Sequence, residues 1–122
     1  MKDLRGKILN VATMLFETRG IHASGIDTII LESGVAKATL YKYFPSKNEL
    51  IIEYLKDGKH IALVSDAGTP NISDPGGLIV KEVAAAGFEI IPIPGVSAVT
   101  TAYSISGMEY TSFYFYGFLP TT

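Results

Sequence analysis

Apolar residues in the first 56 positions recur with the period of an α-helix. The first such stripe begins at Leu4, and Gly20 is expected to end it. Gly34 is a second expected helix end, and Ser46 with Glu49 three residues later forms a capping-box pattern. The front of the chain is therefore predicted to be a bundle of short helices with short connections. These helices are expected over residues 4–16, 24–34, 35–43 and 46–56.

From residue 60 onward, short apolar runs alternate with helical stretches. Strands are expected over residues 60–65, 88–93 and 110–119, with helices capped by Asp74 and by Ser97. A strand–helix–strand–helix order is typical of parallel βαβ units. The predicted fold class is thus α plus α/β, in which a helix-turn-helix bundle precedes a partial parallel βαβα sheet unit with a final edge strand. The expected domains are 1–56 and 57–122, with the helix 46–56 shared.

Composition and charge narrow the class of protein. The 122 residues are 48% hydrophobic and 18% charged, which excludes a disordered or collagen-like chain. Without cysteine there are no disulfides or thiol nucleophiles, and two histidines are too few for a histidine-rich metal site, so no metal is expected. No signal peptide or membrane-spanning segment is recognised, so a cytoplasmic location is expected.

Charge is distributed unevenly along the chain. Residues 1–56 carry eight basic and six acidic side chains, whereas residues 57–122 carry two basic and six acidic ones. A basic front favours nucleic acid as its partner. In the third expected helix and the residue after it, Val35, Leu40 and Phe44 face the core, which leaves outward a set of side chains able to reach bases and phosphates. That set is Lys37, Thr39, Tyr41 and Lys42.

Residues 8–55 resemble the DNA-binding domain of TetR-type repressors. The resemblance is carried by Ala12–Phe16, Gly34-Val35, Thr39–Phe44 and Ser46–Leu50. It implies binding to double-stranded DNA through Ser24, Lys37, Thr39, Tyr41 and Lys47. A single helix-turn-helix lacks the second half-site, so weak, salt-dependent binding of roughly 10⁻⁴ to 10⁻⁶ M is expected.

Two loops rich in glycine and proline, 65–77 and 94–98, follow the first two expected strands. They should therefore share the carboxyl edge of the sheet, where α/β folds bind ligands. The spacing excludes dinucleotide and P-loop fingerprints and a nucleophile elbow. An acid/base pair or magnesium site at Asp66 and Asp74 is disfavoured. From the residues alone, these loops are either binding loops or ordinary turns and helix caps.

Residues 50–120 resemble the tetrapyrrole methylase superfamily, most closely its ribosomal-RNA ribose 2′-O-methyltransferases. The resemblance is carried by Leu63–Pro70, Ile72–Gly76, Pro92–Ala98, Ser106-Gly107 and Gly117–Pro120. It implies a pocket for S-adenosylmethionine and methyl transfer to an RNA ribose hydroxyl, by catalytic residues that stay unknown. Because the family's opening strands and second domain have no counterpart, only half of the cofactor site is expected. The implied cofactor residues are Asp66, Ala67, Gly68, Ile72, Ser97 and Ala98.

Both resemblances are partial and meet within the helix 46–56, so the chain is interpreted as a chimera. Three functions are open: a DNA-binding module with a methylase fragment that does not turn over, a methyl-transferring enzyme, and a folded chimera without activity. Completeness of the helix-turn-helix favours the first. The aromatic tail 110–119 further predicts self-association as a homodimer through the methylase-like half.

Overall fold

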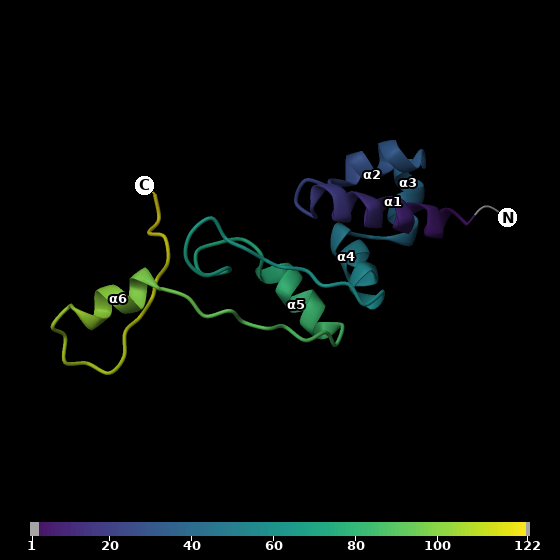
Figure 1. The fold of residues 1–122 in the computed structure, drawn as a ribbon. Helices are drawn as coiled ribbons and strands as arrows, with labels where there is room; N and C mark the ends of the chain where they lie inside the picture. The colour runs from purple at the N-terminus through teal and green to yellow at the C-terminus, as the bar shows by residue number, and fades with distance from the viewer. Residues whose placement is uncertain (1–2, 122) are drawn as a thin grey trace. The chain divides into compact units, whose positions relative to one another are not determined.

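The computed structural model describes residues 3–121 and divides the chain into two units after Ile61. The N-terminal unit (residues 3–61) and the C-terminal unit (residues 62–121) contain the helices labelled in Figure 1. In the N-terminal unit these are α1 (Leu4–Arg19), α2 (Ile26–Ser33), α3 (Lys37–Tyr43) and α4 (Lys47–Lys56). In the C-terminal unit they are α5 (Gly77–Ala85) and α6 (Ala98–Ser104).

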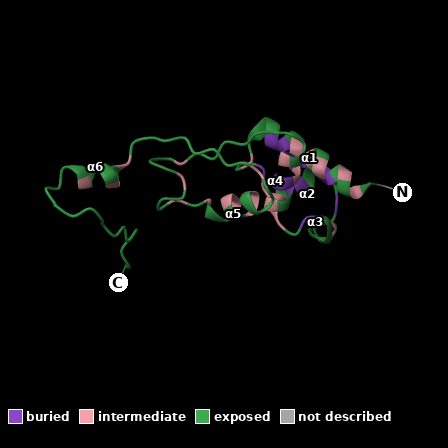
Figure 2. Ribbon diagram, turned by 90° about the horizontal axis from the view of Figure 1, so that it is seen from below, coloured by how far each residue is buried: buried purple, intermediate pink, exposed green. Residues whose placement is uncertain are grey.

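The N-terminal unit is built around α1, which contacts α2, α3 and α4, while α2 also contacts α3. Each helix contributes apolar side chains to a single core, and Figure 2 shows the buried residues gathered in this unit. The ring of Phe16 meets that of Tyr54 edge to face, with centroids 5.7 Å apart. The buried apolar residues are Ile8, Ala12, Leu15, Phe16, Ile29, Val35, Leu40, Phe44, Leu50, Ile51, Ile52 and Tyr54.

Local sequence signals fix most helix ends in the N-terminal unit. The Ser46 hydroxyl accepts the Glu49 N–H at 3.3 Å, which confirms the predicted cap of α4. Gly34 ends α2 in the left-handed region with φ of 63°, as the expected sharp corner requires. The helix expected from residue 24 instead begins at Ile26, because Gly25 is its N-cap and the Ser24 hydroxyl donates to the Gly20 carbonyl at 2.7 Å.

The predicted partial parallel βαβα sheet unit with a final edge strand is wrong. Residues 60–65, 88–93 and 110–119 form no strand, and the described part of the chain, 3–121, contains helices only. A strand is stabilised by hydrogen bonds and side-chain contacts with neighbouring strands, and β propensity largely measures that packing. These segments pair with no neighbour, so most of their apolar residues stay exposed, for example 80% for Val64 and 83% for Ile93.

The C-terminal unit has two short helices and no buried residue among those described, as the absence of purple around α5 and α6 in Figure 2 shows. The Ser97 hydroxyl accepts the Thr100 N–H at 3.4 Å, so the predicted cap of α6 is confirmed. The predicted Asp74 cap is wrong, because α5 begins after Gly76 and without a side-chain cap. This unit therefore lacks the apolar core that stabilises the N-terminal unit.

Candidate nucleic-acid interface

Helix α3 separates a buried side from a polar, exposed side. Leu40 is fully buried, and Phe44, which follows the last helical residue, is 1% exposed. On the other side, Tyr41 is 41% exposed and Lys37 is exposed, while Thr39 is partly buried. The division predicted for this helix is therefore confirmed. An exposed set of hydroxyl, phenol and ammonium groups on one short helix is suited to contacts with bases and phosphates.

The charged side chains of this surface are not locked into strong ion pairs. The Lys37 ammonium lies 3.8 Å from the Asp27 carboxylate, and both side chains are largely exposed. The Lys42 ammonium lies 5.9 Å from the centroid of the Tyr43 ring. Exposed pairs of this kind contribute about 0–1 kcal/mol, so both ammonium groups can exchange their contacts for an anionic partner at low cost.

Ser24 and Lys47, two further positions expected to contact DNA, both make hydrogen bonds within the N-terminal unit, and Lys47 is only partly buried. Ser24 is fully buried. The Lys47 ammonium donates to the Ile21 carbonyl at 2.5 Å, and burial lowers the pKa of Lys47. The structure thus brings Ser24 and Lys47 to the connection between α1 and α2.

A second polar cluster connects α1 with α4. The Glu53 carboxylate accepts hydrogen bonds from Arg5 at 2.8 Å and from Lys56 at 2.7 Å. These hydrogen bonds from Lys56 and then Arg5 lower the pKa of Glu53. The Arg5 guanidinium also lies 5.2 Å from the centroid of the Phe44 ring. Since Phe44 directly follows α3, this cluster fixes the end of α3 against α1 and α4.

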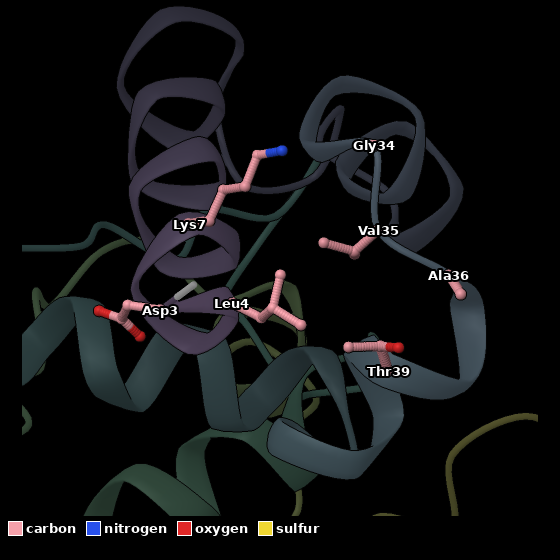
Figure 3. Close-up of a pocket in the computed structure, with 7 residues that line it drawn as sticks. All are labelled: Asp3, Leu4, Lys7, Gly34, Val35, Ala36 and Thr39. Carbon is pink, nitrogen blue, oxygen red and sulfur yellow. The ribbon is translucent and has the colours of Figure 1, made fainter. Parts of the chain in front are cut away.

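A cleft of about 490 Å³ opens between the start of α1 and the corner that joins α2 to α3 (Figure 3). In Figure 3, Leu4 and Val35 point into this space and Lys7 extends towards Gly34, while the carboxylate of Asp3 points away. Lys7 is not among the residues predicted from the sequence to contact DNA. Because residues three apart share a helix face, its position one turn after Leu4 could have indicated that both line the same cleft. The lining residues are Asp3, Leu4, Lys7, Gly34, Val35, Ala36 and Thr39.

The six residues expected to hold S-adenosylmethionine lie in two separate segments of the C-terminal unit. Five of them are exposed, and Ser97 is partly buried. Ser65 donates to the Gly68 carbonyl at 2.9 Å, so the first segment is organised by its own contacts. Among residues 62–121 no hydrogen bond joins the segment 66–72 to Ser97 or Ala98. As arranged, these residues form no enclosed pocket and do not fit S-adenosylmethionine.

Within residues 3–121, no group of three or more histidine, cysteine, aspartate or glutamate side chains is placed to hold a metal ion. None of the helices described there has the length and apolar character needed to cross a membrane.

Comparison with known proteins bears first on the helix-turn-helix. Residues 8–54 match the family model described as "Bacterial regulatory proteins, tetR family". This segment is therefore similar to a domain of that family. The match includes α2, the Gly34 corner and α3, so the exposed polar side of α3 lies within it. No solved structure matches the chain.

The chain is also similar to proteins named ribosomal RNA small subunit methyltransferase I. The protein from Bacillus subtilis is 54% identical over 74 residues, which are 61% of this chain and 25% of that protein. The protein from Leptospira biflexa is 43% identical over 105 residues, which are 84% of this chain and 41% of that protein. The one from Pasteurella multocida is 51% identical over 74 residues, or 61% of this chain and 26% of that protein. The chain thus spans between a quarter and about two fifths of these relatives.

The two similarities overlap along the chain. A match of 74 residues is longer than the stretch from residue 55 to residue 122, so the Bacillus subtilis match extends into the segment that the tetR model covers. The Leptospira biflexa match, at 84% of the chain, includes more than half of residues 8–54. Similarity to a tetR domain and to a methyltransferase in one chain agrees with the interpretation as a chimera. The boundary at residues 56 and 57 stays a prediction.

Proposed function

We propose that the N-terminal unit binds double-stranded DNA weakly and in a salt-dependent way, through the exposed side of α3. The observation that carries this proposal is that Lys37 and Tyr41 are exposed, while Leu40 of the same helix is fully buried in a complete core. A recognition helix needs this arrangement, because its position must be fixed by packing while its polar side stays free for the groove. Thr39 lines the cleft beside α1, where Lys7 provides a second cation for a phosphate.

The test compares two lysines that differ in place but not in type. Binding of the full chain to a fluorescein-labelled mixed-sequence duplex is followed by anisotropy over a range of salt concentrations. Lys37→Met should weaken binding and reduce the slope of log Kd against log salt by about one, as expected for one lost phosphate contact. Lys81→Met, which removes an exposed lysine from α5, should leave both quantities unchanged. Absence of binding at low salt, or equal losses in the two variants, would refute the proposal.

The 54% identity to a ribosomal RNA methyltransferase over 74 residues makes binding of S-adenosylmethionine the alternative function, which the geometry of the C-terminal unit does not favour. The expected site is Asp66, Ala67, Gly68, Ile72, Ser97 and Ala98. Because these residues are mostly exposed and form two unconnected segments, we propose that the chain retains at most a half-site and does not catalyse methyl transfer.

Cofactor binding is tested with ¹⁵N-HSQC spectra recorded with and without saturating S-adenosylhomocysteine. Under this proposal, signals of residues 66–72 and 97–98 shift little or not at all, and no methyl group reaches ribosomal RNA in a radiolabel assay. Large selective shifts in both segments would show that the ligand assembles the site. Methyl transfer above the level of an Asp66→Asn, Ser97→Ala double variant would contradict the proposal of an inactive fragment.

We further propose that the chain self-associates as a homodimer through the C-terminal unit. Large apolar side chains of this unit are exposed, among them Phe118 at 82% and Tyr114 at 85%. An apolar surface of this kind favours association over solvation. Light scattering at about 100 μM should give a mass above that of one chain, and a monomer at that concentration would contradict the proposal.

A DNA partner implies that the protein acts in the cytoplasm.

A further inference from the structure

Asp27 is an exposed carboxylate on the side of α2 that faces the start of α3. It lies in the first turn of α2, and its side chain is 92% exposed. One of its carboxylate oxygens lies 3.8 Å from the ammonium nitrogen of Lys37, which is the first residue of α3. This contact places the Asp27 carboxylate beside the N-terminal end of α3.

The N-terminal end of a recognition helix is the part that contacts base edges. A carboxylate at this place approaches the DNA phosphates, which repel it. The Lys37 ammonium beside it offsets part of that repulsion. Because a lysine ammonium has three N–H donors, Lys37 can stay near Asp27 while it donates to a phosphate.

The chemistry of the base edges limits what the Asp27 carboxylate can bind. An ionised carboxylate only accepts hydrogen bonds, and the donors in the major groove are the amino groups of cytosine and adenine. Adenine presents its N7 acceptor next to its amino group, and that acceptor repels a carboxylate. Cytosine presents only the N4 amino group as a polar group of its own, so cytosine is the favoured partner.

The other acidic side chain of α2, that of Glu32, lies in a different place. Its carboxylate is 4.0 Å from the Arg19 guanidinium of α1, so it lies towards α1 and not beside the start of α3. Glu32 therefore provides a matched control, because it is an exposed acid on the same helix.

We infer that Asp27 is a specificity-determining residue of the DNA interface: its carboxylate accepts a hydrogen bond from the N4 amino group of a cytosine in the major groove. Lys37 remains the adjacent phosphate contact and compensates the charge of the carboxylate. This inference rests on the DNA binding proposed above and adds a base preference to it.

The test uses two fluorescein-labelled duplexes made of G·C pairs only, one with ordinary cytosine and one with N4-methylcytosine. The methyl group replaces the amino hydrogen that faces the major groove and leaves the hydrogen used in base pairing. Anisotropy gives the Kd of each duplex for the full chain and for the variants Asp27→Ala, Asp27→Asn and Glu32→Ala. Circular dichroism confirms that each variant is folded under the conditions of the titration.

The wild-type chain should bind the ordinary duplex about tenfold more tightly than the methylated one. Asp27→Ala lacks an acceptor and should bind both duplexes equally, whereas Asp27→Asn keeps an acceptor oxygen and should keep a preference for the ordinary duplex. Glu32→Ala should show the wild-type ratio. The inference is overturned if the wild-type chain binds both duplexes equally, or if Asp27→Ala and Asp27→Asn change the ratio alike. Tighter binding of both duplexes by the same factor in Asp27→Ala would likewise overturn it, because Asp27 would then only repel phosphates. Failure of the wild-type chain to bind either duplex would refute the proposed function itself, and this inference with it.

Discussion

The Glu53 carboxylate forms ion pairs with two neighbouring cations, Arg5 and Lys56. Its side chain is 19% exposed and accepts hydrogen bonds from Arg5 and Lys56, which keep its pKa below the ordinary value of 4.5. A carboxyl group with a lowered pKa in the folded state stabilises the fold above the pKa of the unfolded state. This stabilisation is lost as pH falls through the folded-state pKa.

We therefore predict a pH-dependent effect of Glu53→Gln on the N-terminal unit. At pH 7 the variant should lose about 0.5–1 kcal/mol of unfolding free energy, and at pH well below 4.5 the difference from wild type should disappear. Urea unfolding followed by the helical circular dichroism signal measures both values. Glu32→Gln is the matched control, since its carboxylate lies 4.0 Å from Arg19, which is too far for a hydrogen bond, and it should show little difference at either pH. An equal loss at both pH values would contradict the prediction.

At the scale of elements, α2 is bounded by two glycines that differ in backbone conformation. Gly25 precedes it with φ of −71°, whereas Gly34 follows it with φ of 63°. A Cβ atom would meet nothing within 4 Å at either position. Conformation alone therefore distinguishes the two sites, and only Gly34 lies in the left-handed region that disfavours other residues.

Gly34→Ala should lower the unfolding free energy by about 1–2 kcal/mol, while Gly25→Ala should change it by less than about 0.5 kcal/mol. Urea unfolding of the two variants under the same conditions provides the comparison. Gly34→Ala should also weaken DNA binding, because the Gly34 corner sets the direction of α3 after α2. Equal stability of the two alanine variants would show that the corner is not strained by a side chain.

Across the whole molecule, burial is concentrated in one unit. The phenylalanines of the N-terminal unit, Phe16 and Phe44, are 5% and 1% exposed. Phe113 and Phe118 of the C-terminal unit are 51% and 82% exposed. Local stability follows buried apolar contact, so the two units should differ in resistance to proteolysis.

Limited digestion with chymotrypsin should cut first after aromatic residues of the segment 110–119 and leave Phe16 and Phe44 intact. Mass spectrometry of the early fragments identifies the sites. Because self-association through the C-terminal unit would cover them, cleavage in this segment should slow as protein concentration rises. Simultaneous cleavage at Phe44 and Phe113 would contradict the difference in burial between the units.

In the N-terminal unit, local sequence patterns predict where helices begin and end. The stripe beginning at Leu4, the Ser46 side-chain cap and the left-handed corner at Gly34 depend on residues close in sequence, and each appears where expected. In the methylase-like half, local patterns do not predict the secondary structure correctly. The apolar runs at residues 60–65 and 88–93 have strand-like composition, but a strand exists only with a neighbour, and none pairs with them in residues 3–121.

Some features of the candidate site also follow from the sequence, whereas others depend on the tertiary structure. The sequence by itself determined the polar side of α3, because Lys37, Thr39 and Tyr41 follow from the helical period once Leu40 is assigned to the core. It also determined both family similarities, which depend on motifs. Only the tertiary structure placed the Lys47 ammonium on the Ile21 carbonyl, since that contact joins residues 26 positions apart. It likewise decided that the C-terminal unit lacks a core, because burial depends on which neighbours are present to exclude water.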